Sequence, residues 1–166
     1  DDYVGKFNLY WEQVKQHIGN LEGKIGKVQR VYHELVAAGG EDGLQVMGKL
    51  SPSSCEISMD KCRNGAELEA VEDKALVEES MDWERCLWMG FASEKVAQTV
   101  SESYVAATRS RYEFIANRIN DTLKPGEVSL LFIRERHLVQ FPNEIQVFSV
   151  VPPVLDEIHR WLRDLS

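Results

Sequence analysis

The sequence predicts an α/β protein with a small, partly parallel sheet, flanking helices and a large helical share. Two continuous apolar runs, EVSLLFI at residues 127–133 and IQVFSV at residues 145–150, have the length and composition of strands buried on both faces. Segments with apolar residues at three- and four-residue steps surround these runs. Because buried strands alternating with helices are typical of sheets covered by helices, this order predicts the fold class.

The N-terminal part of the chain predicts a helix followed by a strand. Residues 7–23 carry apolar side chains near one helical face, with Asn8 as the N-cap and Gly23 as the stop. Residues 24–35 fit either a helix or a strand. Their β-branched content and the preceding glycine favour the strand.

The middle of the chain predicts two short helices and a strand-to-helix junction. A helix is expected around residues 44–50, and Ser51-Pro52 begins a second one that ends at Asn64-Gly65. Residues 66–70 alternate small or apolar with acidic side chains, which is the period-2 pattern of a short strand. Asp73 then stands where an N-cap would begin the next helix.

The C-terminal half predicts long helices, two strands and a final helix. Residues 83–123 contain no proline and keep an apolar three- and four-residue period, so one or two long helices are expected. Lys124-Pro125-Gly126 ends this segment, and the two apolar runs follow as strands. Pro152-Pro153 begins an amphipathic helix whose last apolar residue is Leu165.

Length and composition predict a single domain spanning residues 1–166. Its main parts are the long helical segment at residues 83–123 and a strand-strand-helix unit at residues 127–165. The chain begins at Asp1 with no methionine, so this interpretation leaves room for a further strand upstream.

The charge and hydropathy of the chain disfavour nucleic acids and membranes as binding partners. The net charge is −8, and residues 41–84 hold 12 acidic against 4 basic residues. An acidic chain without a basic stripe is a poor candidate for nucleic-acid binding. No apolar run approaches the roughly 18 residues that span a bilayer, so we expect a soluble cytoplasmic protein without membrane contact. The three cysteines lack the spacing of a zinc site or a disulfide framework.

Polar residues follow two of the predicted strands and form the candidate site. Glu72 comes after the first strand, and Arg134, Arg136 and His137 come after the second. Ligands bind beyond the carboxyl ends of strands in open α/β sheets. Glu72 and His137 could hold a divalent metal, or act as an acid/base pair on a small anionic ligand held by arginine. The alternative is that these residues form solvated ion pairs and ordinary loop contacts.

Residues 111–137, RYEFIANRINDTLKPGEVSLLFIRERH, resemble the C-terminal signature of the TraB/PrgY and erythromycin-esterase-like superfamily. In that signature an arginine opens a helix, a turn follows, and a buried strand leads to a G-x-x-H motif. Arg111, Ile115, Ala116 and Ile119 match the helix, and His137 matches the histidine. GAELEAVED is similar to the strand of the family that ends in glutamate, which places Glu72 there.

The resemblance implies a hydrolase-like site with metal-dependent or acid/base chemistry, in which His137 and Glu72 are catalytic and Arg111 joins Arg134 and Arg136 in binding ligand. Two positions depart from the signature. Tyr112 stands where the family has aspartate, and Arg134 replaces the first glycine of G-x-x-H. A non-catalytic relative is therefore the alternative.

Two functions follow from these observations. The first is a small-molecule or anion site at the strand ends, hydrolase-like in chemistry, with no glycine-rich nucleotide motif and therefore no evident cofactor apart from a divalent metal. The alternative is a non-catalytic interaction module that forms a homodimer through its long helices. Trp83, Trp88 and Phe91 lie in that helical segment, either as a binding face or as helix-packing residues.

Overall fold

A computed structural model describes residues 2–164. It divides the chain into two compact units, one made of the residues up to Val28 together with those from Gln146 onward, and one of Gln29–Ile145. Leu165, at the end of the predicted final helix, lies outside the described residues.

The first unit contains the helices α1 (Asp2–Ile25) and α6 (Val154–Asp164), which contact each other. The rings of Tyr3 and Trp161 stack with centroids 5.0 Å apart, and Lys6 Nζ lies 3.0 Å from a carboxylate oxygen of Glu157. Both predicted helices are confirmed. However, α1 begins before Asn8, the predicted cap, and continues past the predicted stop at Gly23.

A single glycine does not end α1, because glycine inside a helix costs only about 1 kcal/mol relative to alanine. The chain leaves the helix at Gly26, whose φ of 110° lies in the region that favours glycine. The carboxylate of Glu22 then accepts a hydrogen bond from the backbone N–H of Val28 at 2.9 Å.

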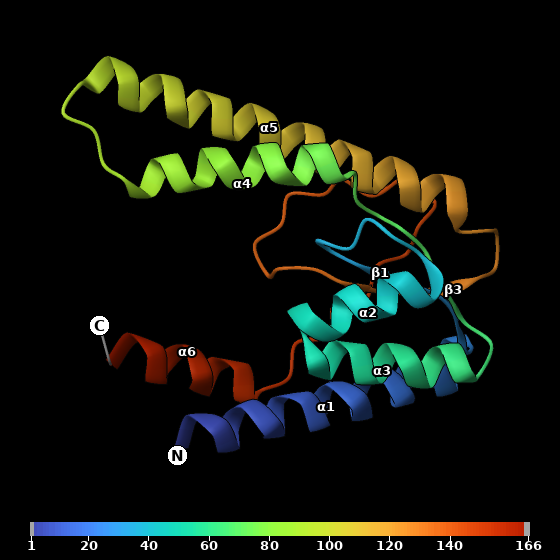
Figure 1. The fold of residues 1–166 in the computed structure, drawn as a ribbon. Coiled ribbons are helices and arrows are strands. Elements are labelled where there is room, and N and C mark those ends of the chain that lie inside the picture. Colours follow the sequence, from blue (N-terminus) through green and yellow to red (C-terminus); the bar gives the residue numbers. More distant parts are fainter. Residues whose placement is uncertain (1, 165–166) are drawn as a thin grey trace. The chain divides into compact units, whose positions relative to one another are not determined.

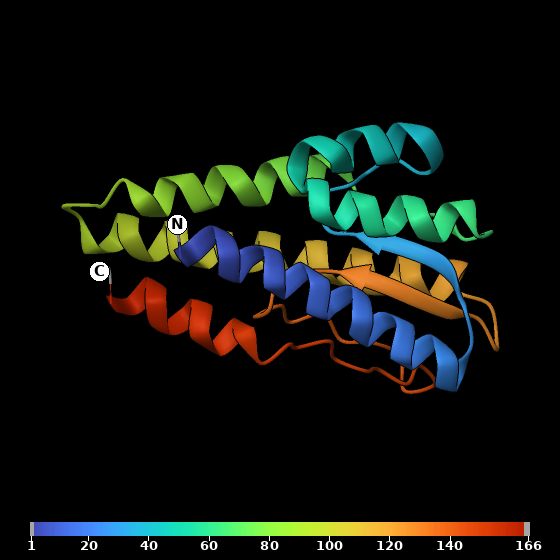
Figure 2. The same ribbon diagram turned by 90° about the horizontal axis from the view of Figure 1, so that it is seen from below.

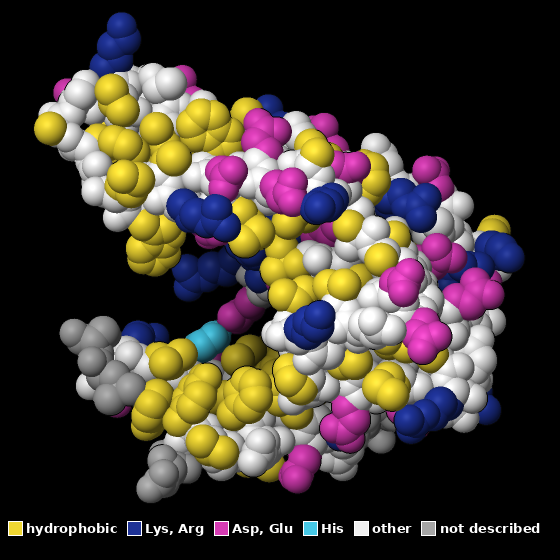
Figure 3. Space-filling model, in the orientation of Figure 1, with side chains coloured by type: hydrophobic (Ala, Val, Ile, Leu, Met, Phe, Trp, Pro, Cys, Tyr) yellow, Lys and Arg dark blue, Asp and Glu magenta, His cyan; other side chains and the backbone are white. Residues whose placement is uncertain are grey.

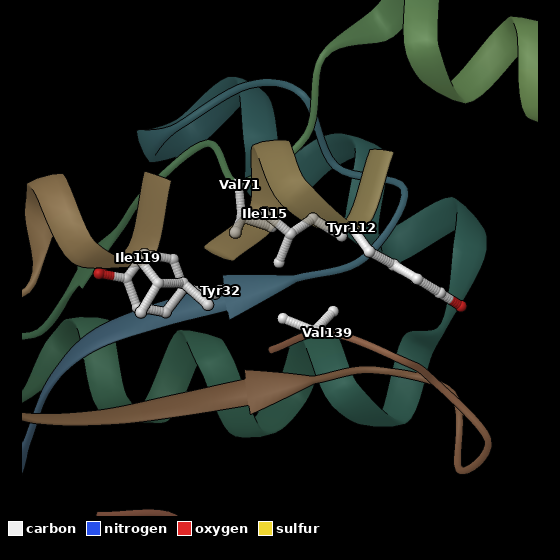
Figure 4. Close-up of a cluster of buried hydrophobic side chains, with 6 residues drawn as sticks. All are labelled: Tyr32, Val71, Tyr112, Ile115, Ile119 and Val139. Atoms are coloured by element: carbon white, nitrogen blue, oxygen red, sulfur yellow. The ribbon is translucent and has the colours of Figure 1, made fainter. Parts of the chain in front are cut away.

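The second unit is built on a three-stranded sheet with the order β2-β1-β3. The strands are β1 (Val28–His33), β2 (Glu67–Leu68) and β3 (Val128–Phe132). Strands β1 and β2 are parallel, with Arg30 opposite Glu67 and Val31 opposite Leu68. The arrows of β1 and β3 point the same way in Figure 4. The predicted α/β fold with a small parallel sheet is therefore confirmed.

Two strand predictions need correction. The run at residues 127–133 forms β3, but β3 is an edge strand with half-buried residues rather than a strand buried on both faces. The run at residues 145–150 forms no strand, and its Val147 and Phe148 are 55% and 45% exposed. An apolar run does not specify a hydrogen-bonding partner. The predicted strand-strand-helix unit at residues 127–165 is therefore wrong in its second strand.

Four helices complete the second unit, namely α2 (Gly40–Leu50), α3 (Pro52–Arg63), α4 (Lys74–Trp88) and α5 (Glu94–Thr122). Asp73 caps α4 as predicted, because its side chain accepts a hydrogen bond from the Leu76 N–H at 3.0 Å. The segment at residues 83–123 contains two helices, since α4 ends at Trp88 and α5 begins after a short loop. Gly90, with φ of 70°, allows the chain to reverse in this loop.

Helices α4 and α5 lie side by side as a hairpin that extends beyond the sheet (Figures 1 and 2). The second half of α5 covers one face of the sheet, where Ile115 and Ile119 join Tyr32 of β1 in a buried cluster (Figure 4). The Tyr32 hydroxyl lies 2.7 Å from Oγ1 of Thr122. Tyr112, one of the two residues that depart from the signature that the sequence resembles, also belongs to this buried cluster.

Helices α2 and α3 contact the sheet through β2 and His33. Because alternate residues of a strand face opposite ways, Tyr32 points toward α5 while its neighbour His33 reaches Ser54 of α3. Gly43 of α2 lies so close to the chain that a Cβ atom there would be 2.4 Å from the Ala38 carbonyl oxygen and 2.8 Å from Cδ2 of Leu68. Helices therefore cover both faces of the sheet.

Candidate functional site

The carboxyl ends of all three strands meet in one network of charged side chains. Glu34 follows β1, Glu72 follows β2, Arg134 follows β3, and Arg111 reaches them from α5. Arg111 Nη2 lies 3.4 Å from Oε2 of Glu34, and Arg134 Nε lies 3.2 Å from the same oxygen. We call these four residues the strand-end network. The structure thus brings together three residues of the predicted site.

The centre of the network is a buried ion pair between Arg111 and Glu72. Arg111 Nε lies 3.0 Å from both carboxylate oxygens of Glu72, and Nη2 makes a further close contact with Oε1. The side chain of Glu72 is 0% exposed and that of Arg111 is 4% exposed. Burial alone would lower the pKa of Arg111, but the hydrogen bonds and charge of Glu72 outweigh it and leave that pKa raised.

Glu72 also holds the backbone at the end of β1. Its Oε1 accepts a hydrogen bond from the backbone N–H of Leu35 at 3.0 Å. Leu35 has a φ of 67°, a left-handed conformation that costs a residue with a side chain about 1–2 kcal/mol. The oxygens of Glu72 are therefore engaged by a guanidinium and by a strained turn, and this carboxylate is enclosed rather than open to a ligand.

The other two predicted residues lie in a turn after β3 that is closed by a 3.3 Å hydrogen bond from the His137 N–H to the Arg134 carbonyl oxygen. His137 packs edge-on against Phe141, and its Nδ1 accepts a hydrogen bond from the Val139 N–H at 3.3 Å. Arg136 is exposed. The contacts of His137 are therefore separate from those of Glu72, and the catalytic and metal-binding roles of both stay predictions.

Within residues 2–164, no group of three or more His, Cys, Asp or Glu side chains is placed to hold a metal ion. Glu34, which joins Arg111 to Arg134, was not among the predicted site residues. The signal was present, because Glu34 directly follows β1 just as Arg134 follows β3. Applying the strand-end rule to every strand would have found it.

A second buried arginine, Arg30 of β1, sits among three carboxylates. Its Nε lies 2.7 Å from Glu127, and its Nη1 lies 2.5 Å from Glu69 and 3.2 Å from Glu67. The hydrogen bond with Glu127 and the nearby negative charges raise the pKa of Arg30 against the opposing effect of burial. These contacts link β1 to Glu67 of β2 and to Glu127, the residue before β3.

His33 is a buried histidine that links β1 to α3. The Glu34 carbonyl oxygen next to Nδ1 can only accept, so Nδ1 carries a proton. Nε2 lies 3.0 Å from Ser54 Oγ, and this hydroxyl also donates to the Ser51 carbonyl oxygen at 3.0 Å. Burial lowers the pKa of His33. Because burial removes the ring from water and so disfavours its charged form, the folded state prefers the neutral ring.

This preference predicts a loss of stability in acid. The pKa of His33 is lower in the folded chain than in the unfolded chain, where it is about 6.5. The contribution of neutral His33 to the free energy of unfolding is therefore fully present above the unfolded-state pKa, and it is lost as the pH falls toward the folded-state pKa. Between pH 7.5 and pH 5.0 the urea midpoint should fall further in the wild type than in His33→Gln, whose glutamine does not titrate. Equal losses in both proteins would contradict this prediction.

Apolar side chains gather at the other end of the second unit, where α4 passes into α5. Trp88 and Met89 are 84% and 80% exposed, and Leu87 and Phe91 are each 36% exposed. We call these four residues the hairpin end. Figure 3 shows hydrophobic side chains gathered at this end of the α4–α5 hairpin and acidic ones along its middle. Of the three aromatic residues considered in the sequence, Trp83 is half-buried, whereas Trp88 and Phe91 belong to this surface.

Comparison of the chain with known protein families, curated proteins and solved structures found no match. None of the helices among the described residues is long and apolar enough to cross a membrane.

Proposed function

We propose that the protein is a non-catalytic interaction module that binds a different protein through the hairpin end. The observation that carries this proposal is the exposure of Trp88 and Met89, two adjacent large apolar residues that are at least four-fifths exposed. Tryptophan is enriched among the residues that dominate binding energy at protein interfaces. Methionine adapts its shape to irregular partner surfaces.

The exposure of the hairpin end contrasts with the burial at the centre of the strand-end network, and this difference supports the proposal. Glu72 is enclosed by Arg111 and the Leu35 N–H, which accounts for it as a structural residue. A catalytic carboxylate must reach the substrate, whereas this one has a fully buried side chain. The side chains of Trp88 and Met89, by contrast, are exposed to solvent.

The proposal predicts that the hairpin end contributes little to stability. In the double variant Trp88→Ser, Met89→Ser, the free energy of unfolding should change by less than about 0.5 kcal/mol, as is usual for exposed positions. Trp83→Ser is the matched control. Trp83 is half-buried on the same helix and lies near a Glu79 oxygen, so its loss should cost clearly more.

Urea unfolding followed by circular dichroism measures both variants. A loss above about 1 kcal/mol in the double variant would mean that Trp88 and Met89 hold the fold together, which contradicts a role reserved for binding.

We also propose a second candidate, the binding of a small anion at the turn after β3. It rests on Arg136, which is exposed in the same turn as Arg134, whose side chain is 40% exposed. Guanidinium groups match the geometry of carboxylate and phosphate. Inorganic phosphate should then raise the melting temperature of the wild type but not of Arg136→Ala. The same rise in melting temperature in both proteins would exclude Arg136 as a phosphate-binding residue.

A further inference from the structure

We infer that the hairpin end binds a basic amphipathic helix, an inference that rests on the proposed function and names its partner class. The apolar hairpin end lies within an acidic stretch of the chain. Residues 78–102 contain six acidic residues and two basic ones, Arg85 and Lys95. One of the two bases is already compensated, because Arg85 Nη1 lies 2.6 Å from Oδ1 of Asp82. Residues 78–102 therefore carry a net negative charge.

The acidic side chains belong to both helices of the hairpin. Asp82 and Glu78 of α4 have side chains 71% and 64% exposed, and Glu94 and Glu102 of α5 are exposed. Exposed acids gain little from a neighbouring base on their own helix, but together they set the sign of the local field. A partner with basic residues around an apolar stripe would match both the apolar centre and the negative surroundings.

This charge pattern disfavours a second copy of the chain as the occupant. Two hairpin ends brought together would place acidic residues from both copies around one apolar contact. Charges within about 10 Å of each other still interact at 0.1 M salt. Each copy also carries a net charge of −8, which adds to the repulsion. We therefore favour a partner of opposite charge, and the homodimer through these helices stays a prediction.

An amphipathic helix has the required shape. Its apolar side chains recur at three- and four-residue steps along one stripe, and its Lys or Arg side chains flank that stripe. The apolar surface is not confined to the loop, since Met81 of α4 is 38% exposed and Val96 of α5 is 46% exposed. A third helix can pack on a helix pair through side-chain ridges and grooves.

The test uses two fluorescently labelled synthetic peptides of about 18 residues, long enough for about five helical turns. One contains only Leu and Lys in an amphipathic helical pattern, and the other has Glu in place of every Lys. Fluorescence anisotropy gives the dissociation constants for the wild type, for Trp88→Ser, Met89→Ser, and for a charge-reversed variant, Glu78→Lys, Glu94→Lys, Glu102→Lys. Circular dichroism and urea midpoints establish that each variant is folded.

We expect the wild type to bind the Leu/Lys peptide at least about tenfold more tightly than the Leu/Glu peptide, with a preference that weakens as salt is added. The charge-reversed variant should prefer the Leu/Glu peptide. The apolar variant should lose at least about tenfold in affinity for the Leu/Lys peptide, as expected when a dominant interface residue is removed.

The outcomes separate the partner class from the proposed function. Equal affinity of the wild type for both peptides, or no affinity for either, overturns the basic partner. A dimer in sedimentation velocity that is lost in Trp88→Ser, Met89→Ser would then show that the hairpin end is a contact surface for a second copy. Peptide binding that is unchanged in the apolar variant overturns the inference and the proposed function together, because the contact would lie elsewhere.

Discussion

Glu72→Ala is expected to lower the free energy of unfolding by about 3–5 kcal/mol, because it leaves the buried guanidinium of Arg111 without its main partner. The variant also removes the acceptor of the Leu35 N–H and so releases the strained turn after β1. Urea unfolding at neutral pH measures the loss. For a domain of this size the variant is expected to melt several degrees below the wild type.

Two further variants identify the cause. Glu67→Ala is the matched control, because Glu67 also contacts a buried arginine but its side chain is 71% exposed, and Arg30 keeps Glu69 and Glu127. Its cost should stay below about 1 kcal/mol. The double variant Glu72→Leu, Arg111→Met should be more stable than Glu72→Ala, since no charge is left buried alone. Wild-type stability in Glu72→Ala would contradict a structural ion pair and reopen a catalytic role.

Ile115→Ala is expected to cost about 2–5 kcal/mol, the usual range for removing a large buried aliphatic side chain. Ile115 is fully buried where α5 packs against Tyr32 and Val71 (Figure 4). Val105→Ala is the control on the same helix, because Val105 is 52% exposed, and its cost should be within about 0.5 kcal/mol. Similar costs for both variants would contradict this cluster as the attachment of α5 to the sheet.

The sequence predicted the features that depend on residues close together along the chain. Asp73 was identified as an N-cap because a capping side chain bonds within its own first turn. The run at residues 145–150 was assigned wrongly, because strand formation depends on a neighbouring strand that composition does not reveal. The same limit explains β3, whose place at the edge of the sheet follows from the strand order.

The strand-end network was partly predictable. The rule that polar residues collect beyond strand ends pointed to Glu72 and Arg134, and the family resemblance added Arg111. Neither indicated that Glu72 would be enclosed, because burial depends on α5 packing over the strand ends. The hairpin end shows the same limit. Trp83 and Trp88 are five residues apart on one helix, yet only the fold decides which of them is exposed.

Hydrogen exchange followed by mass spectrometry shows whether the hairpin end is the docking surface. Amide exchange is compared for the free wild type and for the wild type with saturating Leu/Lys peptide. With bound peptide we expect slower exchange at the end of α4, in the loop after Trp88 and in the first turns of α5, with little change elsewhere. Protection centred on the turn from Arg134 to His137, with none around Trp88, would contradict the hairpin end as the docking surface.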